Sequence, residues 1–282
     1  MTETVAVVGF GQMGTVMANQ LAGTYDVVVY DRDVRRLEAA QKQYATAHLD
    51  ALSAEVVLLA LPGPAEVRAV IPHVLQSGIL VVDTTSIDPE TAILAERMVR
   101  AGGGRYVEAP VLGGPPQAGA WVFLAGGDGD DVVQAARIFD PMGRVVHFGP
   151  VGAGSRAKLL NNMLTGINAA AVAEVLTLAR RLQVDLGKLY DAITNSGSAG
   201  KNAVWEIRVP KILAGTLEDT FSIDLMKKDL VLAQAMADAA GVSIPLTVQS
   251  LTLYDMVAGR GFGARDIGRL ADAFESSGQQ SG

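Results

Sequence analysis

Three strongly polar side chains stand among leucines and a methionine in the stretch SRAKLLNNML, residues 155–164. In a helix, at about 100° per residue, Lys158, Asn161, Asn162, Thr165 and Asn168 share about one third of the circumference. The leucines, the methionine and an isoleucine fill the opposite side, which we interpret as the core side. A solvated face normally carries Glu, Lys and Arg, whereas this stripe has three asparagines, a threonine and one charge. It therefore predicts a polar cleft in which a lysine can exchange a proton and an amide can donate to a substrate oxygen.

A glycine-rich turn is the second place where spacing indicates chemistry. The stretch VAVVGFGQMGTVMANQL, from residue 5, has the GxGxxG pattern between an apolar run and a helical run. Gly9 allows a tight turn, Gly11 lets the backbone approach a pyrophosphate, and Gly14 lets the helix pack closely on the strand. The helix N-terminus offers unpaired N–H groups to the anion. The pattern predicts a dinucleotide site formed by Gly9, Phe10, Gly11, Gln12, Met13 and Gly14.

Asp31 ends the next apolar run, about 20 residues after the glycines. Its carboxylate can accept hydrogen bonds from an adenosine ribose and would repel a 2′-phosphate, which favours NAD. Arg32 follows directly and could pair with a phosphate instead, so NADP remains open. Taken alone, Arg32 is more typical of a solvated loop cation.

Seven short runs rich in Val and Leu alternate with helix-length segments in the first half of the chain. They are residues 5–10, 26–31, 55–62, 79–85, 105–110, 121–127 and 144–149. Apolar runs without polar alternation are typical of strands buried on both faces of a parallel sheet. Residues 1–155 are therefore predicted to form an α/β domain, a Rossmann doubly wound parallel sheet.

The β-branched runs stop after GPVGAGS, residues 149–155, and residues 156–282 are predicted to form an all-α domain. The expected helices are 156–183, 186–195, 201–214, 222–240 and 243–258. No proline or turn cluster interrupts the first, so it would be a long interdomain helix of roughly 40 Å on which the second domain is built. The polar end, residues 275–282, is predicted to be disordered.

Composition excludes several classes of function. The net charge is -7 with no long basic run, so nucleic acid is not an expected partner. The absence of cysteine excludes disulfides and thiolate metal sites, and the three histidines fall at no metal-ligand spacing, so no metal is expected. Residues 1–4 lead into a strand without a basic leader, and no uninterrupted apolar run reaches the ~18 residues of a bilayer span. We expect a cytoplasmic protein without a membrane partner.

Several motifs, in order along the chain, make the sequence resemble the β-hydroxyacid dehydrogenases. This family includes 3-hydroxyisobutyrate dehydrogenase, tartronate semialdehyde reductase and, more distantly, 6-phosphogluconate dehydrogenase. The motifs are GFGQMGTVMANQL, DTTSIDPET (83–91), EAPVLGG (108–114), GAGSRAKLLNN (152–162) and KKDLVLA (227–233), and the similarity covers residues 5 to about 255. The resemblance implies an NAD(P)-dependent oxidoreductase that transfers hydride between nicotinamide and a 3-hydroxy acid or the corresponding semialdehyde.

The resemblance also implies roles for residues of these motifs. Lys158 would be the general acid/base, giving a proton to the carbonyl oxygen in reduction and taking the hydroxyl proton in oxidation. Asn162 would hold the substrate, and Ser86 matches the family position that approaches the nicotinamide.

Three further positions would contact the cofactor. Lys228 matches the lysine that reaches it from the helical domain, with Lys227 as the adjacent alternative. Leu61 and Pro62 correspond to a loop after a strand that passes beside it.

Leu112 departs from the family pattern, which usually has a serine there to receive the substrate carboxylate. The N–H groups of Gly113 and Gly114 would remain as donors. A lost hydroxyl at a charged acceptor costs about 1.5–3 kcal/mol, so we expect a larger or more apolar pocket. Lys201, with Asn202, is a candidate for the missing contact, although a surface lysine at a helix start is the commoner arrangement.

Two other interpretations of the sequence remain open. Imine reductases share the dinucleotide motif, and Leu112 with the Pro115–Pro116 pair points that way, whereas retention of Lys158 and Asn162 argues against it. The other alternative is a non-catalytic cofactor-binding module.

In the resembled family the helical domains usually pack together, which implies a homodimer or homotetramer.

Overall fold

The structure is a computed structural model, and it describes residues 3–275. The chain folds into two compact units, Met1–Leu159 and Leu160–Gly282. The division falls inside one long helix, α6 (Ala153–Arg181), four residues after the boundary predicted from the sequence. Apart from Glu275, the tail predicted to be disordered lies outside the described residues.

A nine-stranded sheet forms the centre of the first unit. Its strands are β1 (Thr4–Val8), β2 (Asp26–Tyr30), β3 (Ala45–Thr46), β4 (Val56–Leu59), β5 (Leu80–Asp83), β6 (Arg105–Glu108), β7 (Val111–Leu112), β8 (Trp121–Gly126) and β9 (Gly143–Gly149). Six of them are parallel in the Rossmann order β3-β2-β1-β4-β5-β6. The seven predicted strands are confirmed, and the Rossmann sheet with them.

The predominantly parallel sheet has an antiparallel part that the sequence did not indicate. Strand β8 runs antiparallel to β6 and to β7, and β9 lies parallel to β8 at the edge. The chain reverses through β7 and a short 3₁₀ turn instead of crossing over through a full helix. Two-residue strands such as β3 and β7 have too few residues to show a periodic pattern, and neither was predicted.

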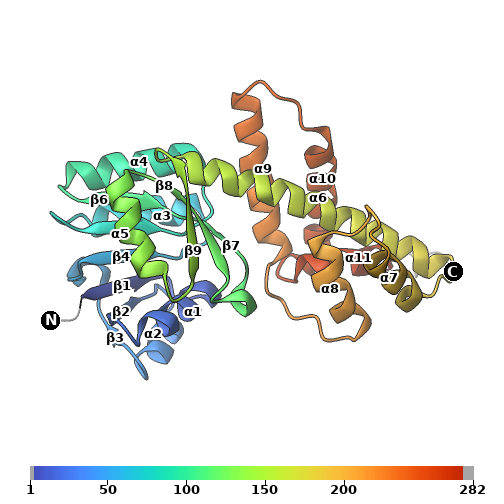
Figure 1. Cartoon of the computed structure of the whole chain (residues 1–282), viewed down its shortest axis with the longest axis horizontal. Helices are drawn as coiled ribbons and strands as arrows, with labels where there is room; N and C mark the ends of the chain where they lie inside the picture. The colour runs from blue at the N-terminus through green and yellow to red at the C-terminus, as the bar shows by residue number, and fades with distance from the viewer. Residues whose placement is uncertain (1–2, 276–282) are drawn as a thin grey trace. The chain divides into compact units, whose positions relative to one another are not determined.

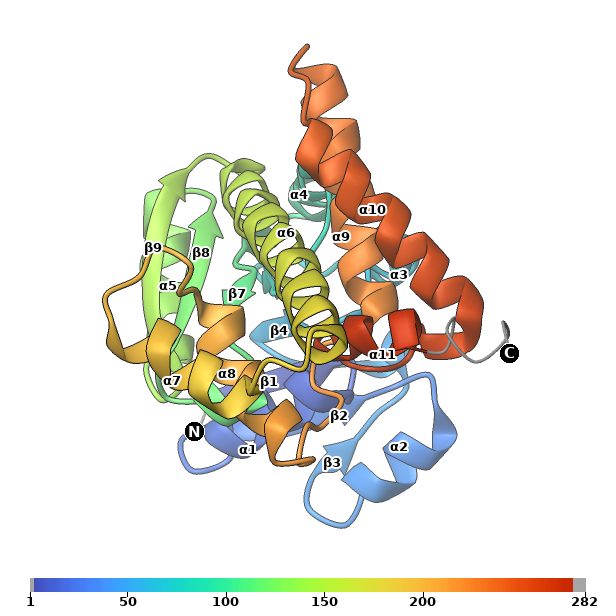
Figure 2. The same cartoon turned by 90° about the vertical axis from the view of Figure 1, so that its right-hand side faces the viewer.

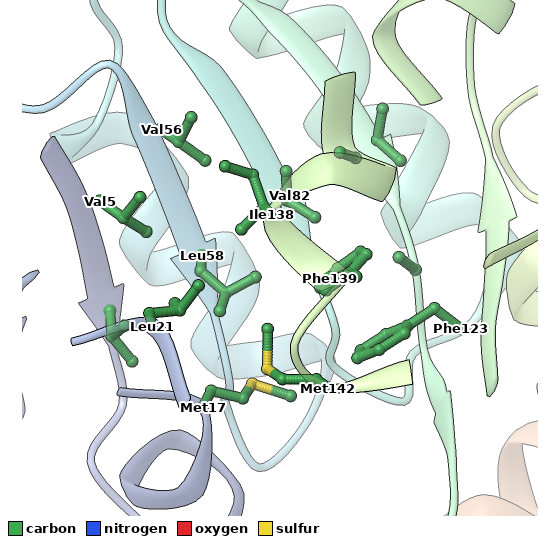
Figure 3. Close-up of a cluster of buried hydrophobic side chains, with 14 of the residues drawn as sticks. Val5, Met17, Leu21, Val56, Leu58, Val82, Phe123, Ile138, Phe139 and Met142 are labelled. Atoms are coloured by element: carbon green, nitrogen blue, oxygen red, sulfur yellow. The ribbon is translucent and has the colours of Figure 1, made fainter. Parts of the chain in front are cut away.

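Helices cover both faces of this sheet (Figure 1). They are α1 (Gln12–Leu21), α2 (Val34–Ala40), α3 (Pro64–Val70), α4 (Pro89–Ala101) and α5 (Gly129–Phe139), with 3₁₀ turns at Leu49–Ala51, Ile71–His73 and Pro115–Gln117. In the first core, Val5 of β1 packs with Met17 of α1 and Phe139 of α5 (Figure 3). The next residue, Ala6, belongs to the opposite core with Val67 of α3. Both faces of β1 are thus buried, which explains its uninterrupted apolar run.

The second unit is helical throughout its regular structure. It contains most of α6, then α7 (Leu186–Asn195), α8 (Ala203–Leu213), α9 (Ile223–Ala239), α10 (Pro245–Val257), a π turn (Ala258–Phe262), a 3₁₀ turn (Ile267–Arg269) and α11 (Leu270–Glu275). Helices α9 and α10 lie side by side in both views (Figures 1 and 2). Its core joins Leu176, Trp205, Leu230, Tyr254 and Leu270. The five predicted helices are confirmed, and α11 was not predicted.

Two of the leucines that the sequence assigns to the core side of α6 lie at the surface, whereas Leu159 is buried as predicted. Leu160 and Leu164, which we interpreted as core residues, are 55% and 66% exposed. The side of α6 that enters the helical core carries small residues, Ala169 and Ala173, which are almost fully buried. A Cβ added to Gly166 would lie 2.9 Å from Leu230. Helices approach so closely here that large side chains are excluded from the contact.

Among the described residues, α6 is also the one helix long and apolar enough to cross a membrane, since it has 29 residues and an 18-residue stretch with a mean hydropathy of 1.3. Core helices of soluble proteins can have the same length and composition. No group of three or more acidic or histidine side chains in the described part of the chain could hold a metal ion. The cytoplasmic location stays a prediction.

Candidate active site

The glycine-rich turn between β1 and α1 has the close packing that its sequence predicts. Gly9 has a φ of +98°, and its N–H donates to the Tyr30 carbonyl at 2.8 Å. A Cβ on Gly14 would lie 1.8 Å from the Gly9 carbonyl oxygen, and one on Gly9 would lie 2.3 Å from that of Ala60. Helix α1 begins after Gly11 without a side-chain cap and without an acidic residue in its first turn. The turn therefore fits a pyrophosphate, which needs close backbone approach and open N–H groups.

Asp31 lies beside this turn and is 7% exposed. One carboxylate oxygen accepts a hydrogen bond from the Phe10 N–H at 2.7 Å, and the other accepts one from the Asp33 N–H at 2.8 Å. The carboxylate thus organises the loop that follows β1 and the one that follows β2. Each oxygen retains a lone pair for a ribose hydroxyl.

Arg36, which the sequence analysis did not single out, is the arginine beside the turn. Its guanidinium lies 3.6 Å from Asp31, and a Cβ on Gly11 would come 3.7 Å from it. Arg32, the residue we had considered for a phosphate contact, lies 3.7 Å from Glu66 instead. The sequence signal for Arg36 was its position in the first turn of α2, five residues after Asp31.

The loops after β4 and β5 are joined by threonine hydroxyls. The Leu61 N–H donates to the Thr85 hydroxyl at 3.2 Å, and the Thr84 hydroxyl donates to the Leu59 carbonyl at 2.7 Å. This brings the Leu61–Pro62 turn next to the segment that carries Ser86. Because β1, β4 and β5 are adjacent and parallel, both loops lie at the edge of the sheet where the glycine turn lies.

Lys158 lies in the second turn of α6, within the first unit. Its ammonium donates to the Val111 carbonyl at 2.8 Å. Val111 and Leu112 form β7, so the structure brings Lys158 together with the segment in which the family's serine is replaced. Two motifs 40 or more residues apart thus meet at one hydrogen bond.

The two glycines after Leu112 differ in what they offer. Gly113 has a φ of +113°, and a Cβ there would lie 2.6 Å from the Trp121 ring. The Gly114 N–H, expected to be open to a carboxylate, donates to the Gln117 side-chain oxygen at 2.8 Å. Gln117 was not predicted, because a glutamine in a proline-rich turn carries no pattern of its own. A ligand that binds the Gly114 N–H must displace this amide.

Glu108 is a buried carboxylate at the end of β6, and it caps the start of α6. It accepts hydrogen bonds from the N–H groups of Gly152 at 2.5 Å, Gly154 at 2.9 Å and Ser155 at 3.3 Å, and from the Ser155 hydroxyl. Burial raises the pKa of Glu108 to about 7, and these hydrogen bonds oppose the rise. On the neighbouring strand, burial raises the pKa of Asp83 to about 6. Neither carboxylate was predicted.

In the helical unit, Asn162 is 2% exposed and its amide is held from both sides. Its nitrogen donates to Asp229 at 2.6 Å, and its oxygen accepts from the Asn161 amide at 3.0 Å. The ammonium of Lys228 lies 2.7 Å from the other oxygen of Asp229. Asp229 therefore joins Asn162 of α6 to Lys228 of α9. It stands inside the KKD motif but was not predicted as a functional residue.

The two other lysines considered from the sequence pair with acids of their own unit. The ammonium of Lys201 lies 2.9 Å from Glu206, at the start of α8. That of Lys227 lies 2.6 Å from Asp255 of α10. Neither is brought to Asn162 or Asp229 by a contact of this kind.

Comparison with known proteins identifies the class of protein. Residues 4–151 match the family model of the NAD binding domain of 6-phosphogluconate dehydrogenase, and residues 152–274 match that of the NAD-binding part of NADP-dependent 3-hydroxyisobutyrate dehydrogenase. The two models together cover nearly the whole described chain, and both describe parts of nicotinamide-dependent dehydrogenases. The chain is therefore an NAD(P)-dependent hydroxyacid dehydrogenase that uses NAD or NADP.

Comparison with individual relatives shows the family to which the chain belongs. The chain is 31% identical to an NAD-dependent L-serine dehydrogenase of Pseudomonas aeruginosa over 97% of its own length and 98% of that protein. It is 33% identical to a 3-hydroxyisobutyrate dehydrogenase of the same organism, over 90% and 92%. A solved 3-hydroxyisobutyrate dehydrogenase of Mycobacterium tuberculosis, with L-serine, superposes with a TM-score of 0.86 at 27% identity, over 97% and 99%. The chain belongs to the β-hydroxyacid dehydrogenase family.

Proposed function

We propose that this enzyme interconverts a short 3-hydroxy acid and its semialdehyde with Lys158 as the general acid/base. The observation that carries the proposal is the 2.8 Å hydrogen bond from the Lys158 ammonium to the Val111 carbonyl, beside Leu112 and Gly113. Nicotinamide supplies the hydride acceptor or donor. In oxidation, the neutral amine of Lys158 takes the hydroxyl proton as the carbon releases its hydride. In reduction, the ammonium returns that proton to the carbonyl oxygen.

The remaining site residues have supporting roles in this proposal. Ser86 approaches the nicotinamide end, Asn162 holds the substrate in the orientation that Asp229 imposes on its amide, and Lys228 contacts the cofactor. Asp31 favours NAD, because a 2′-phosphate would meet the negative charge of Asp31 and the neighbouring Asp33. Arg36 is the nearest cation that could offset this charge for NADP.

Imine reduction is not favoured as the alternative. Relatives at least 30% identical to the chain include proteins named as dehydrogenases of 3-hydroxyisobutyrate and of L-serine. Both of these molecules are 3-hydroxypropanoates that differ in the substituent at C2. A non-catalytic module is not favoured either, because the glycine turn and Lys158 are both retained with close packing around them.

We propose that the pocket accepts a C2 substituent more apolar than the ammonium of L-serine. Leu112 replaces a hydroxyl donor, and Gln117 already occupies the Gly114 N–H. Lys201 would have to leave Glu206 before it could receive a carboxylate. The Gly113 N–H and the displaceable Gln117 amide are then candidate donors to the substrate carboxylate.

A panel of 3-hydroxypropanoates that differ at C2, each assayed with NAD and with NADP, tests this function. We expect turnover by the absorbance of reduced nicotinamide, with a higher kcat/KM for methyl and larger apolar substituents than for L-serine, and with NAD preferred. Leu112→Ser should lower the KM of a small polar acid by about 10-fold, because one hydrogen bond to a charged group is restored. Absence of turnover with every acid would reject the proposed function. An unchanged KM in Leu112→Ser would reject the proposal that Leu112 makes the pocket more apolar.

We further propose a homodimer or homotetramer formed through an apolar stripe on α6. The stripe consists of Leu160, Leu164, Val175, Leu178 and Leu182, which are 43–66% exposed. At about 100° per residue they lie within about 60° of one another. Continuous exposed apolar stripes of this kind mark interaction surfaces.

Sedimentation at micromolar concentration should give a species larger than the monomer. The double variant Leu164→Glu/Leu178→Glu should shift it toward the monomer, because buried carboxylates without partners oppose association. Glu174→Gln, an exposed change on the same helix, is the control. A wild-type enzyme that sediments only as a monomer would contradict the proposal.

A further inference from the structure

Glu108 and the GAGS segment form a closed network within the first unit. One carboxylate oxygen accepts from the N–H groups of Gly152 and Gly154, and the other accepts from the N–H and hydroxyl of Ser155. Glu108 is 1% exposed and Ser155 is fully buried. These donors lie at the start of α6, where a helix places unpaired N–H groups and favours an anion. The side chain therefore fixes the position at which α6 begins.

The glycines around this carboxylate have no room for larger side chains. A Cβ on Gly126 would lie 2.3 Å from a Glu108 carboxylate oxygen, and one on Gly154 would lie 2.1 Å from the Leu124 carbonyl. Gly152 has a φ of +96°, which favours glycine. The first turn of α6 is thus seated directly on β8, and the carboxylate fills the space between them.

Both partners of the Lys158 hydrogen bond are three residues from this network. Lys158 follows Ser155 on α6, and Val111 follows Glu108 on the chain that leaves β6. One side chain therefore ties together the helix that carries the ammonium and the strand that carries its acceptor. If the carboxylate were lost, the two segments could shift relative to each other while the rest of the sheet stayed in place.

We propose that Glu108 is a positioning residue, which holds the first turn of α6 so that Lys158 meets the reacting oxygen of the substrate. The inference rests on the proposed role of Lys158. A displacement of about 1 Å at a catalytic group can cost about 100-fold in rate. The carboxylate suits this task better than a neutral group, because it can accept from four donors at once.

The test combines Glu108→Gln with Lys158→Ala and follows kcat, the KM of the acid and the binding of reduced cofactor by fluorescence. In the wild-type background we expect Glu108→Gln to lower kcat by about 10- to 100-fold while cofactor affinity changes by less than about twofold. In the Lys158→Ala background the same change should alter kcat by less than about twofold, because the group it positions is gone. Hydrogen exchange of the Gly154 and Ser155 amides should be faster in Glu108→Gln, with α5 unchanged.

Two further variants keep the test decisive. Ser155→Ala removes one donor and leaves the carboxylate, so it should lower kcat by a smaller factor, again only when Lys158 is present. Asp131→Asn removes another buried carboxylate, 3.1 Å from Arg105 and outside this network, and should leave kcat unchanged. An equal loss from Glu108→Gln with and without Lys158 would overturn the inference. If Lys158→Ala alone leaves kcat unchanged, the proposed function fails instead.

Discussion

Replacing Lys158 by alanine is expected to lower kcat by about 10²- to 10⁴-fold, the range that a positioned general acid/base contributes. The methyl side chain cannot take the hydroxyl proton, and water in its place lacks the fixed geometry given by the Val111 carbonyl. The binding of reduced cofactor should change little, because the glycine turn is formed by β1 and α1, whereas Lys158 lies on α6. A stopped-flow or steady-state assay that follows the absorbance of reduced nicotinamide gives kcat, and fluorescence titration gives the cofactor affinity.

Lys158→Arg is the matched variant that separates proton transfer from charge. The guanidinium can still donate to the Val111 carbonyl, but it stays protonated at any working pH and cannot act as a base. We therefore expect its kcat in the oxidising direction to be nearly as low as that of Lys158→Ala. Activity of Lys158→Arg close to the wild-type level would mean that the position requires a cation only. Loss of less than about threefold in Lys158→Ala would place the proton transfer on another group.

The main strands and the glycine turn could be predicted because a few consecutive residues are enough to identify each of them. The run VAVV of β1 has neighbouring residues in opposite cores, so it is apolar without alternation, and the glycine turn after it requires three glycines at fixed spacing. Strand β7 and helix α11 could not be predicted in the same way. A two-residue strand has no period, and a six-residue helix has barely one.

The same distinction applies to the candidate site. Lys158 stands out as the one charge in a stripe of asparagines and a threonine on α6, but Glu108 and Asp229 act through partners 44 to 67 residues away. Nothing in EAPVLGG indicates that its glutamate caps a later helix. Leu160 and Leu164 were assigned wrongly for a different reason, because the helical periodicity places large apolar residues in the core. Here Gly166, Ala169 and Ala173 lie at the core contact, whereas Leu160 and Leu164 lie on the exposed side.

Substituting Gly14 by alanine is expected to weaken cofactor binding by about 5- to 150-fold, the equivalent of the roughly 1–3 kcal/mol that overpacking costs. The new Cβ would lie 1.8 Å from the Gly9 carbonyl oxygen and 2.9 Å from its carbon. Both are backbone atoms of the turn itself, so no flexible side chain can move away. Helix α1 must therefore shift from β1, and its N–H groups leave the position that fits a pyrophosphate.

Gly23→Ala is the matched control, because Gly23 follows the same helix and a Cβ there meets nothing within 4 Å. It should leave cofactor affinity within about twofold of the wild type, since α1 need not move. Fluorescence titration of reduced cofactor measures both variants, and thermal unfolding shows whether Gly14→Ala remains folded. A folded Gly14→Ala enzyme with unchanged affinity would remove the glycine turn from the cofactor site. If cofactor binding is weaker in Gly14→Ala but not in Gly23→Ala, the cofactor site depends on the close packing of α1 on β1.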